Sequence, residues 1–229
     1  MGFGRFASIE TAVEQSGVAL ERELLGEMDE RKYQELATEA LAREAIKAEG
    51  LHLSLKEIKA RSRAKYEEIN DKAASEFLQN KHNPILSPAE MFDCVKKSQP
   101  GGPDRPFIAD MKKALVARLK VEDKDVKFSS ALGSNADYCG VDGIFTVVRQ
   151  GHTFDIAIDI TKKTKEEKNL DISQKMARGG KYLGDAIFSF SNREDDYVPE
   201  RDADLIPVFV KEIIDVMRRQ ISEHNAKIK

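Results

Sequence analysis

The sequence predicts an α/β protein in which a helical amino-terminal part precedes a mixed sheet flanked by helices. Two observations carry this prediction. Residues 8–97 are rich in Ala, Glu, Lys, Leu and Arg, which favour helix, whereas the later residues alternate β-branched runs with helical patterns. Between the two parts, the segment from Gln99 to Pro103 contains two Pro and two Gly. We therefore predict a helical domain at 1–99 and an α/β domain at 104–229.

The composition excludes several classes of protein. The 229 residues are 41% hydrophobic and 34% charged, with a net charge of −3. No apolar run approaches the ~20 residues that span a bilayer, and no signal-peptide core is recognisable. Cys94 and Cys139 form no zinc or redox motif, which favours a reducing compartment. We expect a cytoplasmic protein without a membrane partner, in which any nucleic acid is bound by a local basic patch.

The helical part is expected to form at least three helices. Apolar residues recur at helical spacing up to Gly50, where the pattern stops. A long helix is predicted over 54–79, because Glu57 completes a capping box at its start. Pro88 suits the first turn of a further helix over 88–97. Nothing in this part points to chemistry, so we expect it to serve binding or dimerisation.

The second part has a different order of elements. Apolar spacing predicts helices and β-branched alternation predicts strands. The predicted helices are 107–119, 170–182 and 205–224, and the predicted strands are 126–132, 138–148, 153–161 and 186–190. One helix, three strands, a helix, a strand and a final helix make up an α/β unit with a mixed sheet.

The second and third strands are expected to form a hairpin. If Gln150 and Gly151 make a two-residue turn, antiparallel partners have residue numbers that sum to 301. Asp142 would then lie opposite Asp159, with β-carbons about 4.5–5.5 Å apart. Two facing carboxylates repel unless a cation lies between them. The register therefore predicts a site for a hard divalent cation such as Mg²⁺.

Alternation along the third strand separates the side chains that face the core from the acidic side chains. Phe154 and Ile156 point to one face with Ile158 and Ile160, whereas Asp155 and Asp159 point to the other. The same register pairs Asp155 with Thr146, and we expect Asp155 to be structural. The acidic face of this strand is thus the predicted site.

These residues resemble a known family. The run from Gly140 to Gly143, followed by 154–163, is similar to the paired motifs of the PD-(D/E)xK, or restriction-endonuclease-like, nuclease superfamily. The resemblance implies a restriction-endonuclease-like fold and hydrolysis of phosphodiester bonds with Mg²⁺ or Mn²⁺. It also implies that Asp142 and Asp159 are the metal ligands, and many similar nucleases act as homodimers.

The lysine of the motif is displaced in this chain. Thr161 stands where the family has lysine, two residues after Asp159. Strand alternation favours Lys163 as the catalytic lysine, whereas a bulge at the strand end would favour Lys162. A lysine on the following helix, Lys175 or Lys181, is a third possibility.

A run of basic residues leaves the predicted metal site. It is expected to bind the nucleic-acid backbone, more likely of DNA than of RNA. The proposed binding residues are Lys165, Lys168, Lys175, Arg178 and Lys181. The alternative function is a non-catalytic protein that keeps the nuclease fold and acts in nucleic-acid binding or protein assembly.

Overall fold

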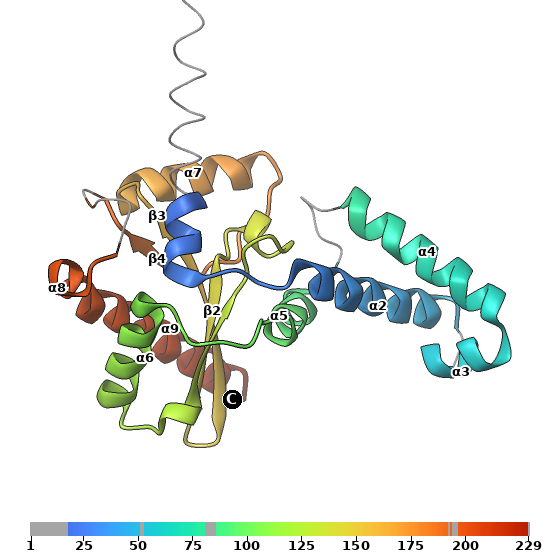
Figure 1. Cartoon of the computed structure of the whole chain (residues 1–229), viewed down its shortest axis with the longest axis horizontal. Helices are drawn as coiled ribbons and strands as arrows, with labels where there is room; N and C mark the ends of the chain where they lie inside the picture. Colours follow the sequence, from blue (N-terminus) through green and yellow to red (C-terminus); the bar gives the residue numbers. More distant parts are fainter. Residues whose placement is uncertain (1–17, 51–52, 81–85, 192, 194–196, 229) are drawn as a thin grey trace, which may run out of the picture.

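The structure is a computed structural model that describes residues 18–50, 53–80, 86–191, 193 and 197–228. Residues 18–25 are helical, and the remaining helices are α2 (Glu30–Ala48), α3 (Leu55–Arg61), α4 (Arg63–Gln79), α5 (Pro88–Lys97), α6 (Pro106–Leu119), α7 (Lys165–Ala177), α8 (Pro199–Asp202) and α9 (Leu205–Ile228). The strands are β1 (Val126–Ser130), β2 (Gly143–Arg149), β3 (His152–Thr161) and β4 (Ala186–Ser189). Helices α2, α3 and α4 form an arm that projects from the sheet and its flanking helices (Figure 1).

The predicted α/β class and the mixed sheet are confirmed. The four strands lie in the order β1-β2-β3-β4, with β1, β2 and β3 antiparallel and β4 parallel to β3. The parallel pair needs a crossover connection, which α7 provides. Of the helices in the described ranges, none has the length and apolarity to cross a bilayer.

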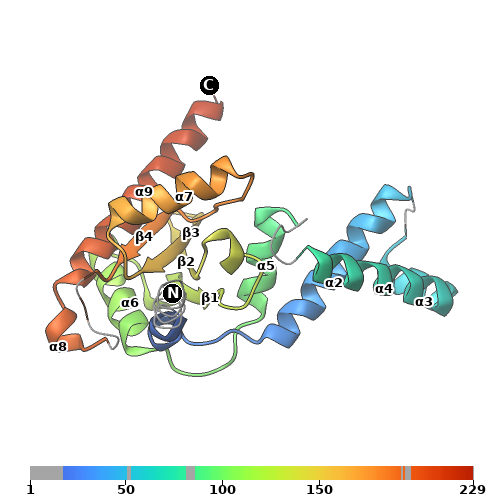
Figure 2. The same ribbon diagram turned by 90° about the horizontal axis from the view of Figure 1, so that it is seen from above.

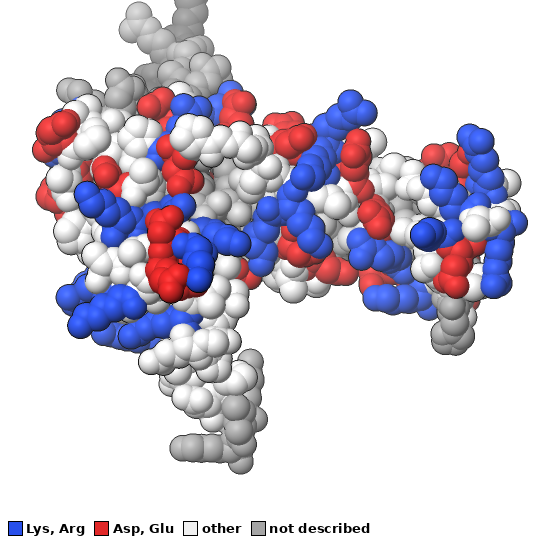
Figure 3. All heavy atoms as spheres, turned by 60° about the horizontal axis from the view of Figure 1, so that its bottom comes forward, with Lys and Arg blue, Asp and Glu red and all other residues white. Residues whose placement is uncertain are grey.

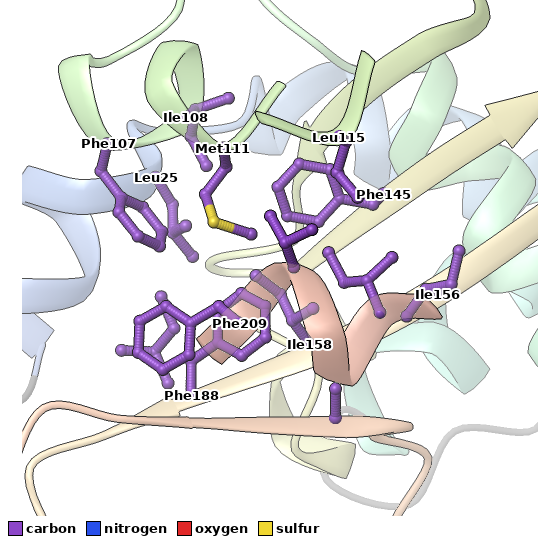
Figure 4. Close-up of a cluster of buried hydrophobic side chains, with 14 of the residues drawn as sticks. Leu25, Phe107, Ile108, Met111, Leu115, Phe145, Ile156, Ile158, Phe188 and Phe209 are labelled. Atoms are coloured by element: carbon purple, nitrogen blue, oxygen red, sulfur yellow. The ribbon is translucent and has the colours of Figure 1, made fainter. Parts of the chain in front are cut away.

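One face of the sheet is covered by α6 and α9. Phe188 of β4 stacks on Phe209 of α9, with ring centroids 4.3 Å apart and an interplanar angle of 10°. Phe107 of α6 meets both rings edge to face. Ile156 and other apolar residues of β3 complete this core (Figure 4). The predicted apolar alternation of the third strand is therefore confirmed.

The opposite face of the sheet belongs to a second apolar cluster. Ile144 of β2 and Ala157 of β3 are buried in the same cluster as Met91 and Val95 of α5. The view from above shows α5 between the sheet and the arm (Figure 2). Residues 18–25 contribute Leu20, Leu24 and Leu25 to the core beneath α6 and α9. Both apolar clusters thus combine residues from before and after the 99–103 segment; residues 1–17 of the predicted helical domain lie outside the described residues.

The prediction of one long helix over 54–79 is wrong. The capping box of Ser54 and Glu57 is present, but the helix ends at Arg61 and a new one begins at Arg63. Ser62 separates them with extended backbone angles of φ −153° and ψ 103°, and its side chain accepts a hydrogen bond from Lys65 N. A serine that can cap a helix competes with continued helix, because its oxygen satisfies a free backbone N–H group.

Several element boundaries also differ from the prediction; α7, for example, ends at Ala177 rather than at 182. The second strand begins at Gly143 rather than at 138, because residues Asp137–Cys139 form a 3₁₀ turn that ends at Gly140 with φ 75°. Helix α7 begins at Lys165 rather than at 170. Thr164 and Glu167 form a capping box that starts it earlier. A left-handed glycine before β2 and a polar cap before α7 set these two starting points, and apolar periodicity reports neither.

Candidate functional site

The hairpin register predicted from the turn is confirmed. Gly143 pairs with Ile158 and Arg149 pairs with His152, so the residue numbers of both pairs sum to 301. Gln150 and Gly151 have φ angles of 52° and 78°, as a two-residue hairpin turn requires. The regular ladder ends at Gly143, one residue short of Asp142.

Asp142 is held by backbone groups at the open end of this ladder. Its own N–H donates to the Ile158 carbonyl at 2.8 Å, and its carbonyl accepts from Ala131 N at 2.8 Å. The side-chain oxygen Oδ2 accepts from Ile160 N at 2.5 Å. The carboxylate therefore takes the place of a backbone acceptor next to Asp159, which fixes its position rigidly.

Both acids are buried. Asp142 is 5% exposed and Asp159 is 1% exposed. Burial raises the pKa of Asp142 well above its usual value, and the charges of Asp159 and Glu21 raise it further. Burial also raises the pKa of Asp159, against the opposing effect of Lys168. When two carboxylates lie close together and away from water, sharing a proton or binding a cation lowers their mutual repulsion.

Lys168 is the basic residue that contacts this pair. Its Nζ lies 2.8 Å from Oδ1 of Asp159, and its side chain is 23% exposed. Although burial opposes it, the charge of Asp159 and their hydrogen bond raise the pKa of Lys168 above its usual value. The first turn of α7 delivers this lysine to the end of β3, because the Thr164 capping box starts the helix directly after the strand.

Glu21 is a further carboxylate whose charge acts on the two acids. It lies in the 18–25 helix, whose Leu20 and Leu24 are anchored in the core. Burial, followed by the charges of Asp137 and Asp159, raises the pKa of Glu21 to about 7. Its charge is also among those that raise the pKa of Asp142. The amino-terminal segment thus contributes the charge of an acid to a site whose predicted residues all follow the 99–103 segment.

The remaining oxygen of Asp159 tests whether a cation fits. Asp159 Oδ2 is buried and, within the described part of the chain, has no hydrogen-bond partner. In the same part of the chain, no group of three or more His, Cys, Asp or Glu side chains is arranged to hold a metal ion. Mg²⁺ usually takes one or two carboxylates and completes its shell with water and substrate phosphate. Asp142 and Asp159 fit that mode of binding, and they do not fit an all-protein cage.

Asp155, on the same face of β3, has a different environment. Its Oδ1 accepts from Thr146 Oγ1 at 2.7 Å, and its Oδ2 pairs with Lys96 Nζ of α5 at 2.8 Å. These contacts confirm the predicted pairing with Thr146 and join the hairpin to α5. Asp155 is a structural acid, and it offers a control for the two site acids.

The structure does not bring Lys163 to Asp159. Thr161, in the position of the motif lysine, accepts a hydrogen bond from Lys163 N at 3.1 Å and turns the chain at the end of β3. The Lys163 side chain then pairs with Asp171 at 2.7 Å. Lys162 is half-buried in the same turn. The lysine that contacts Asp159 comes from the next helix, as the third alternative allowed, but it is neither Lys175 nor Lys181.

The predicted backbone-binding residues have diverse surroundings. Lys165 pairs with Glu212 of α9, and Lys175 donates to the Tyr138 carbonyl. Arg178 and Lys181 are exposed at the end of α7 and in the loop that follows. Lys168 is engaged by Asp159. Of these five side chains, the exposed ones thus lie at and just beyond the carboxyl end of α7.

Sequence reasoning missed Glu21, the position of Lys168 and the neighbouring Tyr182. Glu21 lies between Leu20 and Leu24 in the sequence, but residue spacing cannot report which distant carboxylates a helix faces.

A groove of about 720 Å³ lies between α2, α3 and α4, and its lining includes none of the site residues. No protein-family model, curated protein or solved structure matches this chain.

Proposed function

We propose that the protein is a metal-dependent nuclease of the restriction-endonuclease-like type, which hydrolyses phosphodiester bonds and takes DNA as its substrate. The observation that carries the proposal is the buried pair of Asp142 and Asp159 at the end of the β2–β3 ladder. Burial of two neighbouring acids costs stability unless a cation or a proton lies between them. A cation site at this place is the simplest reason for the arrangement.

The fold supports the proposal. Three antiparallel strands are followed by a crossover helix and a parallel fourth strand, as the resemblance to the nuclease superfamily implies. The motif acids lie at the end of β2 and on β3, which are rigid elements joined by a two-residue turn. Catalytic groups are best held on such elements, because small displacements reduce the rate steeply.

The side chains have distinct roles in this proposal. Asp142 and Asp159 hold Mg²⁺ or Mn²⁺, and Glu21 adds negative charge on the side of the 18–25 helix. The bound cation lowers the pKa of water and stabilises charge on the phosphate. Lys168, rather than Lys163 or Lys162, orients the water or phosphate, because its ammonium group already lies at Asp159. It replaces the motif lysine from a neighbouring element.

The substrate is expected to approach along α7. None of the side chains of this helix is buried, and Arg178 and Lys181 are exposed beyond its carboxyl end. Lys and Arg alternate with Asp and Glu over the face shown in Figure 3, on the α/β unit and along the arm. The face in that view, which is not the one that carries α7, therefore offers no broad basic platform for phosphates. By the same resemblance, we propose a homodimer with one site for each strand.

Cleavage assays test the proposal. Plasmid, linear and single-stranded DNA and RNA are incubated with Mg²⁺, with Mn²⁺ and with chelator. We expect cation-dependent cleavage that Asp142→Asn and Asp159→Asn each reduce to the chelator level. Asp155→Asn is the matched control, since it changes an acid of the same strand that contacts Thr146 and Lys96. Cleavage that survives both site substitutions would refute the assignment.

A second candidate function is a non-catalytic nuclease fold that binds nucleic acid or assembles with protein. The observation that favours it is the ion pair between Lys168 and Asp159, which supplies a positive charge to one of the acids without a metal. Thr161 in the motif position points in the same direction. This candidate requires nucleic-acid binding or oligomerisation that chelator leaves unchanged, with no turnover under any of the conditions above.

A further inference from the structure

Two polar atoms beside the acid pair are buried without a partner. They are Oδ2 of Asp159 and the hydroxyl oxygen of Tyr182. Within the described ranges neither has a partner in good hydrogen-bond geometry, although the two side chains lie close enough to interact with each other. An unsatisfied buried polar atom costs about 1–3 kcal/mol, so two together call for a physical reason. The side chain of Asp159 is 2% exposed, so bulk water does not solvate it.

Two glycines set the position of the Tyr182 ring. A β-carbon on Gly140 would lie 2.5 Å from Cε2 of Tyr182 and 3.2 Å from Oδ2 of Asp159. A β-carbon on Gly184 would lie 2.5 Å from the Tyr182 hydroxyl. The ring therefore occupies space that only glycine leaves free, and one glycine touches both the ring and the carboxylate. This packing holds the hydroxyl at the site of the acids.

The two groups also interact electrostatically. Burial, the charge of Asp159 and hydrogen bonding with it all raise the pKa of Tyr182 above its usual value. An ordinary phenol, with a pKa of about 10, is already protonated at neutral pH and can donate a hydrogen bond. A protonated hydroxyl beside a carboxylate oxygen can donate to a water that the carboxylate's cation holds. It cannot replace the carboxylate as a ligand for a hard cation, because a neutral phenol is a weak one.

We propose that Tyr182 is a positioning residue of the cation site, whose hydroxyl binds and orients a water of the divalent cation held by Asp159. The inference rests on the proposed function and adds a residue that the nuclease motif does not contain. The geometric support is the pair of unsatisfied atoms and the two glycines that hold the ring beside them. An outer-shell partner of this kind raises cation affinity without contacting the metal.

Terbium luminescence tests the inference. Tb³⁺ is a hard cation that emits when a nearby tyrosine is excited, and the chain contains five Tyr and no Trp. We expect Tb³⁺ to bind the wild-type protein with sensitised emission, to be displaced by Mg²⁺, and to lose its site in Asp159→Asn. In Tyr182→Phe, sensitised emission is lost, and the Mg²⁺ affinity measured by calorimetry falls about 10–100-fold. Tyr66→Phe on α4 is the matched control and leaves both unchanged.

The possible failures can be told apart. If Tyr182→Phe keeps the wild-type emission and Mg²⁺ affinity while the wild-type protein cleaves nucleic acid, the role of Tyr182 is refuted and the nuclease stands. The same conclusion follows if Tyr182→Phe loses only thermal stability, since a purely structural hydroxyl would do that. If the wild-type protein binds neither Tb³⁺ nor Mg²⁺, or if Asp159→Asn binds them equally well, the inference and the proposed function both fail.

Discussion

At the scale of single residues, the site combines buried acidic side chains with a lysine, largely out of contact with water. Asp142 accepts a hydrogen bond from Ile160 N, and Asp159 pairs with Lys168. Burial raises the pKa of both acids despite these partners. An apolar pair at these positions would cost less folding free energy than two buried acids. Acids with raised pKa values that are kept despite this cost are typical of functional sites.

The choice of lysine gives a prediction. We expect Lys168→Met to reduce cleavage about 10²–10³-fold, the usual effect of removing one preorganised electrostatic group. Lys163→Met is the matched control, because it removes only the contact with Asp171. Turnover numbers on one DNA substrate at saturating Mg²⁺ compare the two variants. Loss of activity in the Lys163 variant alone would instead support the lysine that strand alternation favours.

The sequence correctly predicted that Asp142 and Asp159 are neighbours, but it did not predict which lysine contacts them. Asp142 and Asp159 follow from a two-residue turn and the two-residue period of a strand, both of which are local. Lys168 follows from the Thr164 cap, which starts α7 early enough for its first turn to reach β3. Residue spacing alone indicated Lys163, because it could not show that Thr161 turns the chain toward Asp171.

At the scale of elements, the connection from β4 to α9 depends on a buried acid. Asp202, in α8, is 1% exposed. It accepts from Val198 N at 3.0 Å and from Arg201 at 2.7 Å, and it lies 3.5 Å from Arg193. Hydrogen bonding from Arg201 holds the pKa of Asp202 below its usual value of 3.8. Its ionised form therefore stabilises the fold.

This acid gives a pH-dependent prediction. Because the folded pKa is lowered, the stabilisation is present above about pH 4 and is lost as the pH falls through the folded value. We expect Asp202→Asn to lower the free energy of unfolding at pH 7 by about 1.5–3 kcal/mol. Urea unfolding at pH 7 and pH 3 should show the difference from wild type shrinking at pH 3. Asp204→Asn, an exposed neighbour, is the control, and an equal loss at both pH values would contradict the linkage.

At the scale of the whole molecule, the 99–103 segment connects two parts of the chain that share both apolar clusters. Leu20 and Leu24 precede it and pack under α6 and α9, whereas Ile144 and Ala157 follow it and pack with α5. Burial of apolar surface dominates folding free energy, so each part supplies surface that the other needs.

Cutting the chain at this segment tests that view. With a protease site inserted at the exposed Gly101, we expect the two cleaved pieces to co-elute in size-exclusion chromatography. The isolated fragment 104–229 should lack cooperative thermal unfolding, because it exposes the apolar patches that residues before 99 cover. A fragment that unfolds cooperatively on its own would establish the domain boundary that the sequence composition predicts.

The sequence by itself determined the order of the main elements after the 99–103 segment, the mixed sheet and the hairpin register. Each depends on neighbouring residues: apolar period, turn residues and linker composition. Only the tertiary structure decided that Lys168 contacts Asp159, that Tyr182 lies beside it and that the charge of Glu21 acts on the same acids. These interactions join segments far apart in the chain, and the packing of the 18–25 helix, α7 and the glycine-flanked loop sets them. Local residue spacing determines on which face of a helix or strand a side chain lies. Long-range packing determines which other residues that face contacts.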